Sequence, residues 1–261
     1  MGNVNLSLIN GELLKEFYGD FAKPSVQSVG KALGTVFDIV FGGLSYFPQK
    51  GNIYLKNNLE RYRKKLENVP VDNIIPADPQ IGVPIVEKLK YITHDEIADL
   101  FTTLLANASN SETVESVHPS FISIIEQLAS DEAKIIEYLN TNPNIPYCDI
   151  NGTLKQCDND PILHNSYNIL IYHATALPWQ IDILKNNVGV YLNNLVRLGI
   201  LTDEKGTLIQ DMSLYDNIHE LYGVKKMRDS LVPDKYQQIY TEKSFYSITD
   251  FGRLFINACV K

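Results

Sequence analysis

A long apolar segment near the start of the sequence constrains the fold more than any other feature. Residues 26–47 lie between Pro24 and Pro48, and their apolar side chains recur at helical spacing. As a helix this segment would be about 33 Å long, close to the thickness of a bilayer. The side chains that form its apolar arc are Val29, Leu33, Val36, Phe37, Val40, Phe41, Leu44 and Phe47.

Two interpretations of residues 26–47 stay open, a core helix and a membrane-active helix. Asp38 lies near the middle of the segment, and an Asp in mid-bilayer costs about 2.5–3.5 kcal/mol, which disfavours a simple spanning helix. The small residues Gly34 and Gly42 share one face with Asp38, so several copies could turn this face inward and shield the carboxylate. A wide apolar arc more commonly indicates burial among other helices.

The remainder of the first half has helical periodicity throughout. Leu55, Leu59, Tyr62 and Leu66 mark one face of a helix, and the apolar residues between 97 and 108 mark another. Further helices are expected over residues 118–128 and from residue 130 onward. We therefore predict a helical domain over residues 1–142.

The second half mixes strand and helix signals. Asn151-Gly152 is a strong hairpin signal, and residues 161–176 could be helical. One long helix is expected over residues 178–199, followed by a strand, turn and strand over residues 200–210. This order is typical of a winged helix-turn-helix. The predicted fold class is mainly α, with an α+β winged-helix-like domain over residues 143–261.

A candidate binding face lies on the predicted long helix, where polar side chains share the outer surface. In a winged-helix domain such side chains could read DNA base edges or contact a protein. The net charge of −8 disfavours nucleic acid as a partner, because the chain supplies no general attraction to a polyanion. The residues of this face are Lys185, Asn186, Asn193, Asn194 and Arg197.

No catalytic or metal-binding motif stands out in the sequence. The triplet Asp250-Phe251-Gly252 matches the magnesium motif of kinases, but the other kinase motifs are missing. A zinc site from His118, His164, Cys148 and Cys157 would need a spacing unlike the usual cysteine pairs. A local main-chain contact ahead of a helix is the simplest interpretation of His118. We expect no enzyme activity, no metal and no cofactor.

Four stretches of the sequence resemble the abortive-infection alpha (Abi-alpha) family, a bacterial family known as a domain of unknown function. They are PSVQSVGKALGTVFDIVFGGLSYF, VHPSFISIIEQLASDEAKIIEYL, YLNNLVRLGIL and SITDFGRLFINACV. The resemblance implies a role in resistance to bacteriophage, and it implies no catalytic residues.

The expected location and partners follow from the same features. The sequence opens without a signal-peptide pattern. Its three cysteines are few, and an odd number cannot all pair within one chain, which is unlike a disulfide scaffold. We therefore expect a cytoplasmic protein, with peripheral association with the inner membrane as the alternative for residues 26–47. The expected partner is an unidentified protein or a second copy of the chain. Two mechanisms remain open: membrane association through residues 26–47, and recognition of DNA or of a phage or host protein by the second domain.

Overall fold

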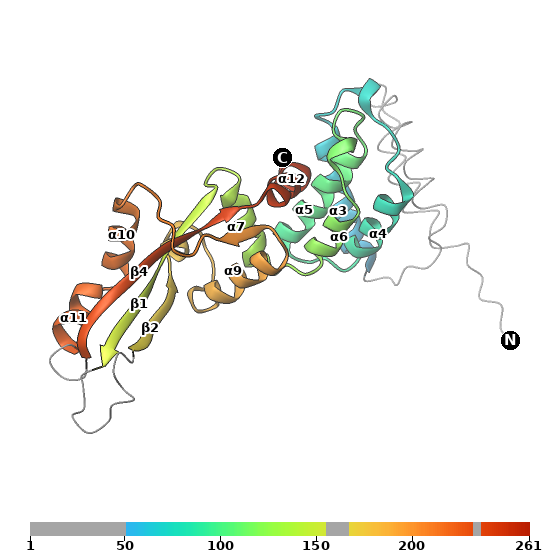
Figure 1. Cartoon of the computed structure of the whole chain (residues 1–261). Coiled ribbons are helices and arrows are strands. Elements are labelled where there is room, and N and C mark those ends of the chain that lie inside the picture. Colours follow the sequence, from blue (N-terminus) through green and yellow to red (C-terminus); the bar gives the residue numbers. More distant parts are fainter. Residues whose placement is uncertain (1–50, 155–166, 232–235) are drawn as a thin grey trace. The chain divides into compact units, whose positions relative to one another are not determined.

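The computed structural model describes residues 51–154, 167–231 and 236–261 of the chain (Figure 1). These residues belong to two compact units. The first contains the described residues up to Ala133 together with Leu254–Lys261, and the second contains the described residues within Lys134–Arg253.

The first unit is built from helices. Four apolar residues of its first helix, Leu55, Leu59, Tyr62 and Leu66, are each at most 3% exposed, as their spacing predicts. The buried Tyr62 hydroxyl lies 2.8 Å from Ser109 Oγ, so its polar atom has a partner. The helices of this unit are α3 (Gly51–Leu66), η1 (Val71–Asn73), α4 (Pro79–Leu89), α5 (Asp95–Ala108), η2 (Val114–Ser116), α6 (Ser120–Ile125), the start of α7 (Ser130–Leu139) and the end of α12 (Asp250–Cys259).

The second unit is built around a four-stranded antiparallel sheet with the strand order β2-β1-β4-β3. The helices α10 (Ser213–Leu221) and α11 (Val224–Leu231) lie beside this sheet in Figure 1. Their buried Tyr215, Ile218 and Val224 form one apolar cluster with Cys148 and Ile150. The strands are β1 (Asn144–Leu154), β2 (Tyr167–Ala174), β3 (Leu201–Asp203) and β4 (Tyr236–Ile248), and the other described helices are the end of α7, α8 (Leu177–Gln180), η4 (Lys185–Asn187), α9 (Val188–Arg197) and the start of α12.

The predicted fold class is wrong, because the chain is mixed α/β and not mainly α with a winged-helix-like domain over residues 143–261. The expected wing over residues 200–210 does not form. The chain turns after β3, where the Thr207 N–H donates to the Glu204 carbonyl oxygen over 2.9 Å. β3 pairs instead with the end of β4, far along the sequence, and forms the edge strand of the sheet.

The predicted long helix over residues 178–199 is also wrong, because it is broken into α8, η4 and α9. Ile181 is extended, with φ −135° and ψ 151°. Two contacts with α7 hold this break: the Asp182 carbonyl oxygen accepts from Lys134 Nζ over 2.9 Å, and Gln180 Oε1 accepts from the Tyr138 hydroxyl over 2.8 Å. Tertiary contacts thus override the helical spacing of the apolar residues.

Asn151-Gly152 does not form the predicted hairpin turn. Both residues lie within β1, where Gly152 pairs with Asn168 of β2 and Ile239 of β4. A Cβ atom at Gly152 would lie 2.6 Å from Cδ1 of Tyr236. Glycine is therefore needed here because an aromatic ring lies against the strand. The segment expected to be helical over residues 161–176 contains β2.

Replacing Gly152 by Ala should lower the free energy of unfolding by about 1–3 kcal/mol, because the new methyl group overlaps the Tyr236 ring. Chemical denaturation of the full-length variant measures this loss. Combining the change with Tyr236→Ala should give a loss smaller than the sum of the two single losses, because the clash is then absent. Additive losses would contradict this account of Gly152.

Candidate functional site

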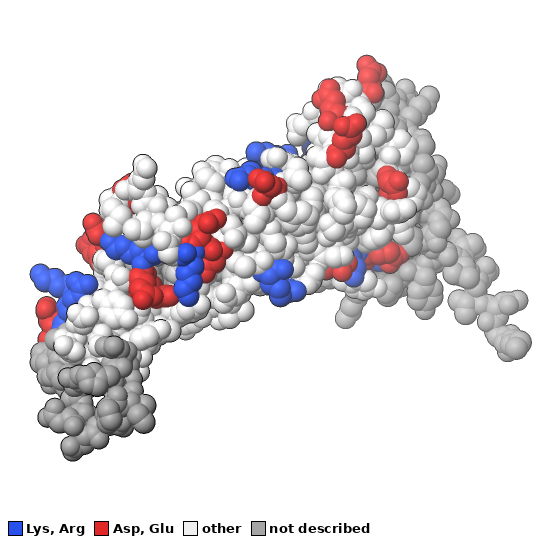
Figure 2. Space-filling model, viewed as in Figure 1, with Lys and Arg blue, Asp and Glu red and all other residues white. Residues whose placement is uncertain are grey.

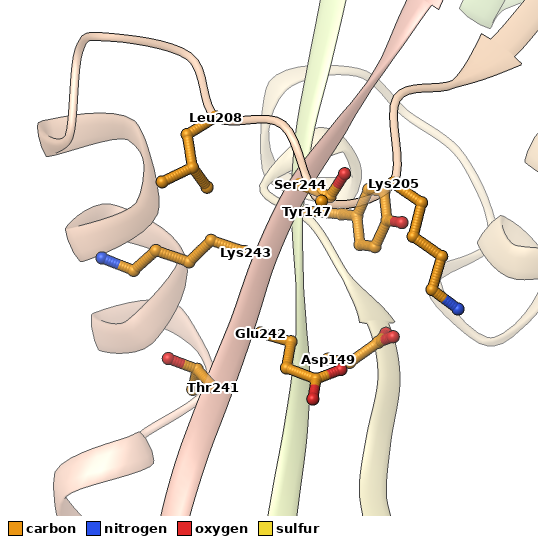
Figure 3. Close-up of a pocket in the computed structure, with 9 residues that line it drawn as sticks. Tyr147, Asp149, Lys205, Leu208, Thr241, Glu242, Lys243 and Ser244 are labelled. Carbon is orange, nitrogen blue, oxygen red and sulfur yellow. The ribbon is translucent and has the colours of Figure 1, made fainter.

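A pocket of about 450 Å³ lies beside β4 in the second unit (Figure 3). Four consecutive residues of β4 line it, and their side chains alternate between the two sides of the strand. β1 and the loop after β3 supply the remaining walls. The lining residues are Tyr147, Asp149, Lys205, Gly206, Leu208, Thr241, Glu242, Lys243 and Ser244.

The pocket follows an edge of β4 that has no neighbouring strand in the described part of the chain. β3 pairs only with residues 246–248, although β4 extends back to Tyr236. Two carbonyl groups on this edge are bonded: that of Phe245 accepts from the Glu204 N–H over 2.9 Å, and that of Ile239 accepts from Arg228 Nε over 3.2 Å. Between them lie residues 241–243, which we call the free edge.

The main-chain groups of the free edge are open to a ligand. In a strand, alternate residues direct their N–H and C=O groups to the same side. The main-chain N–H and C=O groups of Thr241 and Lys243 therefore point away from β1, in the same direction as those of Phe245 and Ile239. Within residues 51–154, 167–231 and 236–261, no hydrogen bond to these outward groups is formed.

The charged side chains of the pocket are divided between the two sides of β4. Asp149 and Glu242 are directly opposite each other in the β1–β4 pairing, and Figure 3 shows both carboxylates on the same side of β4. Lys243 points to the other side, where its Nζ lies 5.4 Å from the ring centre of Tyr215. Lys205 comes from the loop after β3. The two ammonium groups therefore do not form a single basic cluster.

A buried polar cluster lies next to the pocket, centred on His173. The Tyr246 hydroxyl is hydrogen-bonded to His173 Nδ1, and the exposed Tyr172 ring stacks on the imidazole at 3.7 Å between ring centres. The Tyr147 hydroxyl donates to Asp203 Oδ1 over 2.8 Å, and its ring lies 4.2 Å from that of His173. This cluster forms the inner wall behind Tyr147 and Asp149.

Asp149 holds His173 in an uncommon backbone conformation. His173 has φ +48°, in the left-handed region, which is rare for a residue other than glycine. The register of β1 and β2 shifts at the same place, between Cys148 and Ile150. Asp149 Oδ1 accepts from the His173 main-chain N–H over 2.8 Å, and this bond fixes the irregular strand geometry.

Removing the Asp149 carboxylate should therefore destabilise the second unit. Asp149→Ala leaves the buried His173 N–H without its acceptor, which should lower the free energy of unfolding by about 1–3 kcal/mol. Asp149→Asn retains an acceptor oxygen, so its loss should be clearly smaller. Denaturation gives both values, and the exchange rate of the His173 amide should rise most in Asp149→Ala. Equal losses in the two variants would contradict the role of this bond.

Burial controls the protonation states in the cluster. Burial lowers the pKa of His173, and the nearby Asp149 and Asp203 carboxylates only partly oppose this effect. Burial also raises the pKa values of Tyr147 and Tyr246 far above the usual tyrosine range. A neutral imidazole and protonated phenols suit hydrogen bonding, and they leave the cluster without an activated nucleophile.

Folding lowers the pKa of His173, so this side chain binds a proton more readily in the unfolded chain than in the folded one. The stability that neutral His173 contributes is present above about pH 6.5 and is lost as the pH falls through the lower folded-state pKa. The free energy of unfolding, measured from pH 8 to pH 5, should decrease less steeply in His173→Gln than in the natural chain. The difference between the two curves removes the contributions of titratable groups that both proteins share, such as His219. Parallel curves would contradict this assignment.

The thiol of Cys148 does not line the pocket and is buried within the apolar cluster under α10. Its Sγ lies 3.7 Å from His219 Nε2, and burial raises its pKa to about 12. A thiol with so high a pKa is a poor nucleophile and a poor metal ligand.

The residues considered for zinc are not brought together by the described part of the chain. His118 accepts from the Ser120 N–H over 3.1 Å in the first unit, which is the local contact expected for it. Cys157 and His164 lie outside the described residues. Among the residues that are described, no group of three or more His, Cys, Asp or Glu side chains could hold a metal ion.

The Asp250-Phe251-Gly252 triplet has a structural role. It forms the first turn of α12, where the Gly252 N–H donates to Thr249 Oγ1 over 2.8 Å. A Cβ atom at Gly252 would lie 2.3 Å from the Ile200 carbonyl oxygen. Glycine is thus needed for the close approach of two main-chain segments.

The predicted apolar helix over residues 26–47 lies outside the described residues. This applies to all eight residues of its apolar arc: Val29, Leu33, Val36, Phe37, Val40, Phe41, Leu44 and Phe47. The helices in residues 51–154, 167–231 and 236–261 are all too short or too polar to cross a bilayer.

The residues of the predicted binding face lie in two consecutive elements that follow the break at Ile181. Lys185 and Asn186 lie in η4, whereas Asn193, Asn194 and Arg197 lie in α9. Lys185 Nζ lies 4.0 Å from the Trp179 ring centre and 4.8 Å from that of Tyr222, and Asn194 Oδ1 accepts from Arg197 Nε over 3.0 Å. Several of these side chains thus contact other residues of the chain. Figure 2 shows acidic and basic side chains interspersed on the face in view.

Sequence reasoning missed the residues of the pocket. The pattern Tyr240, Glu242, Ser244, Tyr246 alternates along β4 and places these side chains on one face of the sheet. This alternation could have identified the strand. It could not have shown that Asp149 would lie opposite Glu242, because that pairing joins segments far apart in the sequence.

Comparisons with known proteins confirm the predicted resemblance. The family model described as "Abortive infection alpha" matches residues 54–259. No curated protein matches the chain. A solved structure of an uncharacterized protein from the hydrocarbon-degrading marine bacterium Alcanivorax borkumensis SK2 is 12% identical, with a TM-score of 0.34. That likeness covers 58% of this chain and 96% of the other, and at this TM-score it carries no argument.

Proposed function

The chain belongs to the Abortive infection alpha family, and from this premise we propose that it defends against bacteriophage by binding a phage or host protein in the pocket beside β4. The family name places the chain in abortive infection. The proposal adds the mechanism: recognition of a protein, without catalysis, by the second unit.

The observation that carries this proposal is the position of the pocket along the edge of a strand. Small-molecule sites typically enclose most of the surface of their ligand. This pocket has charged and hydroxyl-bearing side chains on both sides of β4, together with open main-chain groups. Such a surface matches a polypeptide, which offers main-chain hydrogen bonds and side chains on two sides.

The protonation states of the neighbouring groups supply no activated nucleophile. The pKa of His173 is lowered and those of Tyr147 and Tyr246 are raised, chiefly by burial, so each favours its neutral form. The Cys148 thiol is buried in the apolar cluster under α10, and burial raises its pKa to about 12. None of these groups is set up as the activated nucleophile of a covalent mechanism.

Site-specific crosslinking in cells tests the proposal. A photoreactive amino acid replaces Leu208, which lines the pocket and is 49% exposed. The matched control carries it at Tyr91, a residue of the first unit that is 65% exposed. We expect position 208, and not position 91, to crosslink to one protein identified by mass spectrometry in infected or uninfected cells. Equal crosslinking at both positions, or none at 208, would contradict the proposal.

Membrane association through residues 26–47 remains a second candidate, supported by the length and apolar arc of that segment. Its test is membrane fractionation of the natural chain and of a variant in which residues 26–47 are replaced by a polar helix. Membrane association that resists a high-salt wash and disappears in the variant would support it. Equal amounts of both folded proteins in the supernatant, before and during infection, would count against it.

A further inference from the structure

We infer that the partner binds as an extended segment that pairs with the free edge of β4 as an additional strand, and that a lysine or arginine of this segment lies against Asp149 and Glu242. This inference rests on the proposed function and specifies how that function is carried out.

The first argument is that β3 ends before the edge of β4 is fully paired. Glu204 still bonds to β4, through its N–H to Phe245, and its carbonyl oxygen accepts from Ser244 Oγ over 2.7 Å. The chain then turns away through Gly206, whose φ of +83° is favoured by glycine. The position that a longer β3 would occupy beside residues 241–243 is the pocket itself.

The second argument is the set of open hydrogen-bonding groups along this position. The outward N–H and C=O groups of Thr241 and Lys243 form no hydrogen bond with any other described residue. An extended segment is the ligand that satisfies such groups in sequence, because its own N–H and C=O groups repeat at the same spacing. A compact small molecule could satisfy only some of them.

The third argument concerns the side chains of the added segment, which would alternate between the two sides of β4. On one side they meet Glu242 and, one strand further on, its direct partner Asp149 of β1, with Lys205 on the same side of β4 (Figure 3). Like charges at opposed positions destabilise a sheet, and a long cationic side chain that extends over Glu242 toward Asp149 relieves this repulsion. In the described part of the chain, Glu242 is exposed and forms no ion pair.

The other side of β4 fits a different residue. There the added segment would meet the Leu208 side chain and the stem of Lys243, whose ammonium group lies near the Tyr215 ring. These groups favour an apolar or acidic side chain next to the basic residue in the partner sequence. The expected ligand is thus an extended stretch that alternates between basic and apolar or acidic residues.

Peptide selection with the full-length protein tests this inference. A displayed library of random twelve-residue peptides is selected on the immobilised chain, and the enriched sequences are synthesised. We expect them to carry Lys or Arg next to apolar or acidic residues. Replacing the basic residue by Gln should weaken binding roughly tenfold. Glu242→Gln in the protein should weaken binding of the unaltered peptide and have little effect on the Gln-substituted one.

Hydrogen exchange then identifies the binding mode. The amides of Thr241 and Lys243 should exchange more slowly when the selected peptide is bound, because their N–H groups become donors in the new strand pair. Unchanged exchange at both amides, or peptides without a basic residue, would overturn the inference. If crosslinking at Leu208 still identifies a protein, the proposed function stands and only strand addition fails. If neither a peptide nor a protein binds, both fail.

Discussion

Replacing Gly252 by Ala is expected to lower the free energy of unfolding by about 3 kcal/mol, the largest loss from a single added methyl group that the structure indicates. The new Cβ atom would lie 2.3 Å from the Ile200 carbonyl oxygen and 3.0 Å from its carbon. Both belong to the main chain, so no side chain can rotate to make room.

The surrounding hydrogen bonds prevent the two segments from separating. The Ile200 carbonyl oxygen accepts from the Thr249 N–H over 3.1 Å, and Thr249 Oγ1 accepts from the Gly252 N–H over 2.8 Å. Moving α12 away from residue 200 would break the first of these bonds or disturb the cap of the helix.

A matched glycine in the same unit provides the control. A Cβ atom at Gly189, in the first turn of α9, would have no neighbour within 4 Å. Gly189→Ala should leave the free energy of unfolding unchanged or raise it by up to about 1 kcal/mol, because alanine favours a helix more than glycine does. Urea denaturation of both variants measures the contrast, and similar losses in the two would contradict the steric argument.

Local sequence patterns predicted two helices of the first unit, α3 and α5. Leu55, Leu59, Tyr62 and Leu66 of α3 are buried as expected, and so are the apolar residues between 97 and 108 on α5. In both cases the determining contacts are set by periodicity or by residues three positions apart. Such information is present in a short stretch of sequence.

The second unit was mispredicted because its determining contacts are long-range. Gly152 suggested a turn, yet the ring of Tyr236 requires a glycine there. The apolar spacing over residues 178–199 suggested one helix, yet hydrogen bonds from Lys134 and Tyr138 stabilise an interruption near residues 180–182. A propensity describes what a segment favours alone, and these partners come from distant parts of the chain.

The candidate site could not have been predicted for the same reason. Neither Asp149 nor Glu242 belongs to a recognisable motif, and their significance depends on the register that places them side by side. The free edge depends on where β3 stops, and the short β3 segment does not itself indicate how far it will pair with β4.

A proline at the free edge should abolish phage protection without unfolding the chain. Thr241→Pro removes an N–H group that points away from β1, so the pairing of β1 with β4 keeps its own hydrogen bonds. The same proline blocks an added strand, because its ring occupies the edge and one donor is lost. Thr241→Val is the matched control, since it keeps the N–H group and favours a strand.

The most direct measurement of the central claim is therefore the plaque count of a phage that the natural chain restricts, on cells expressing each folded variant. Thermal unfolding of the purified proteins first establishes that Thr241→Pro and Thr241→Val are folded, and Lys243→Pro replaces the former if it is not. The account predicts full protection by Thr241→Val and loss of protection by the folded proline variant. Protection by the folded proline variant equal to that of the natural chain would contradict the account.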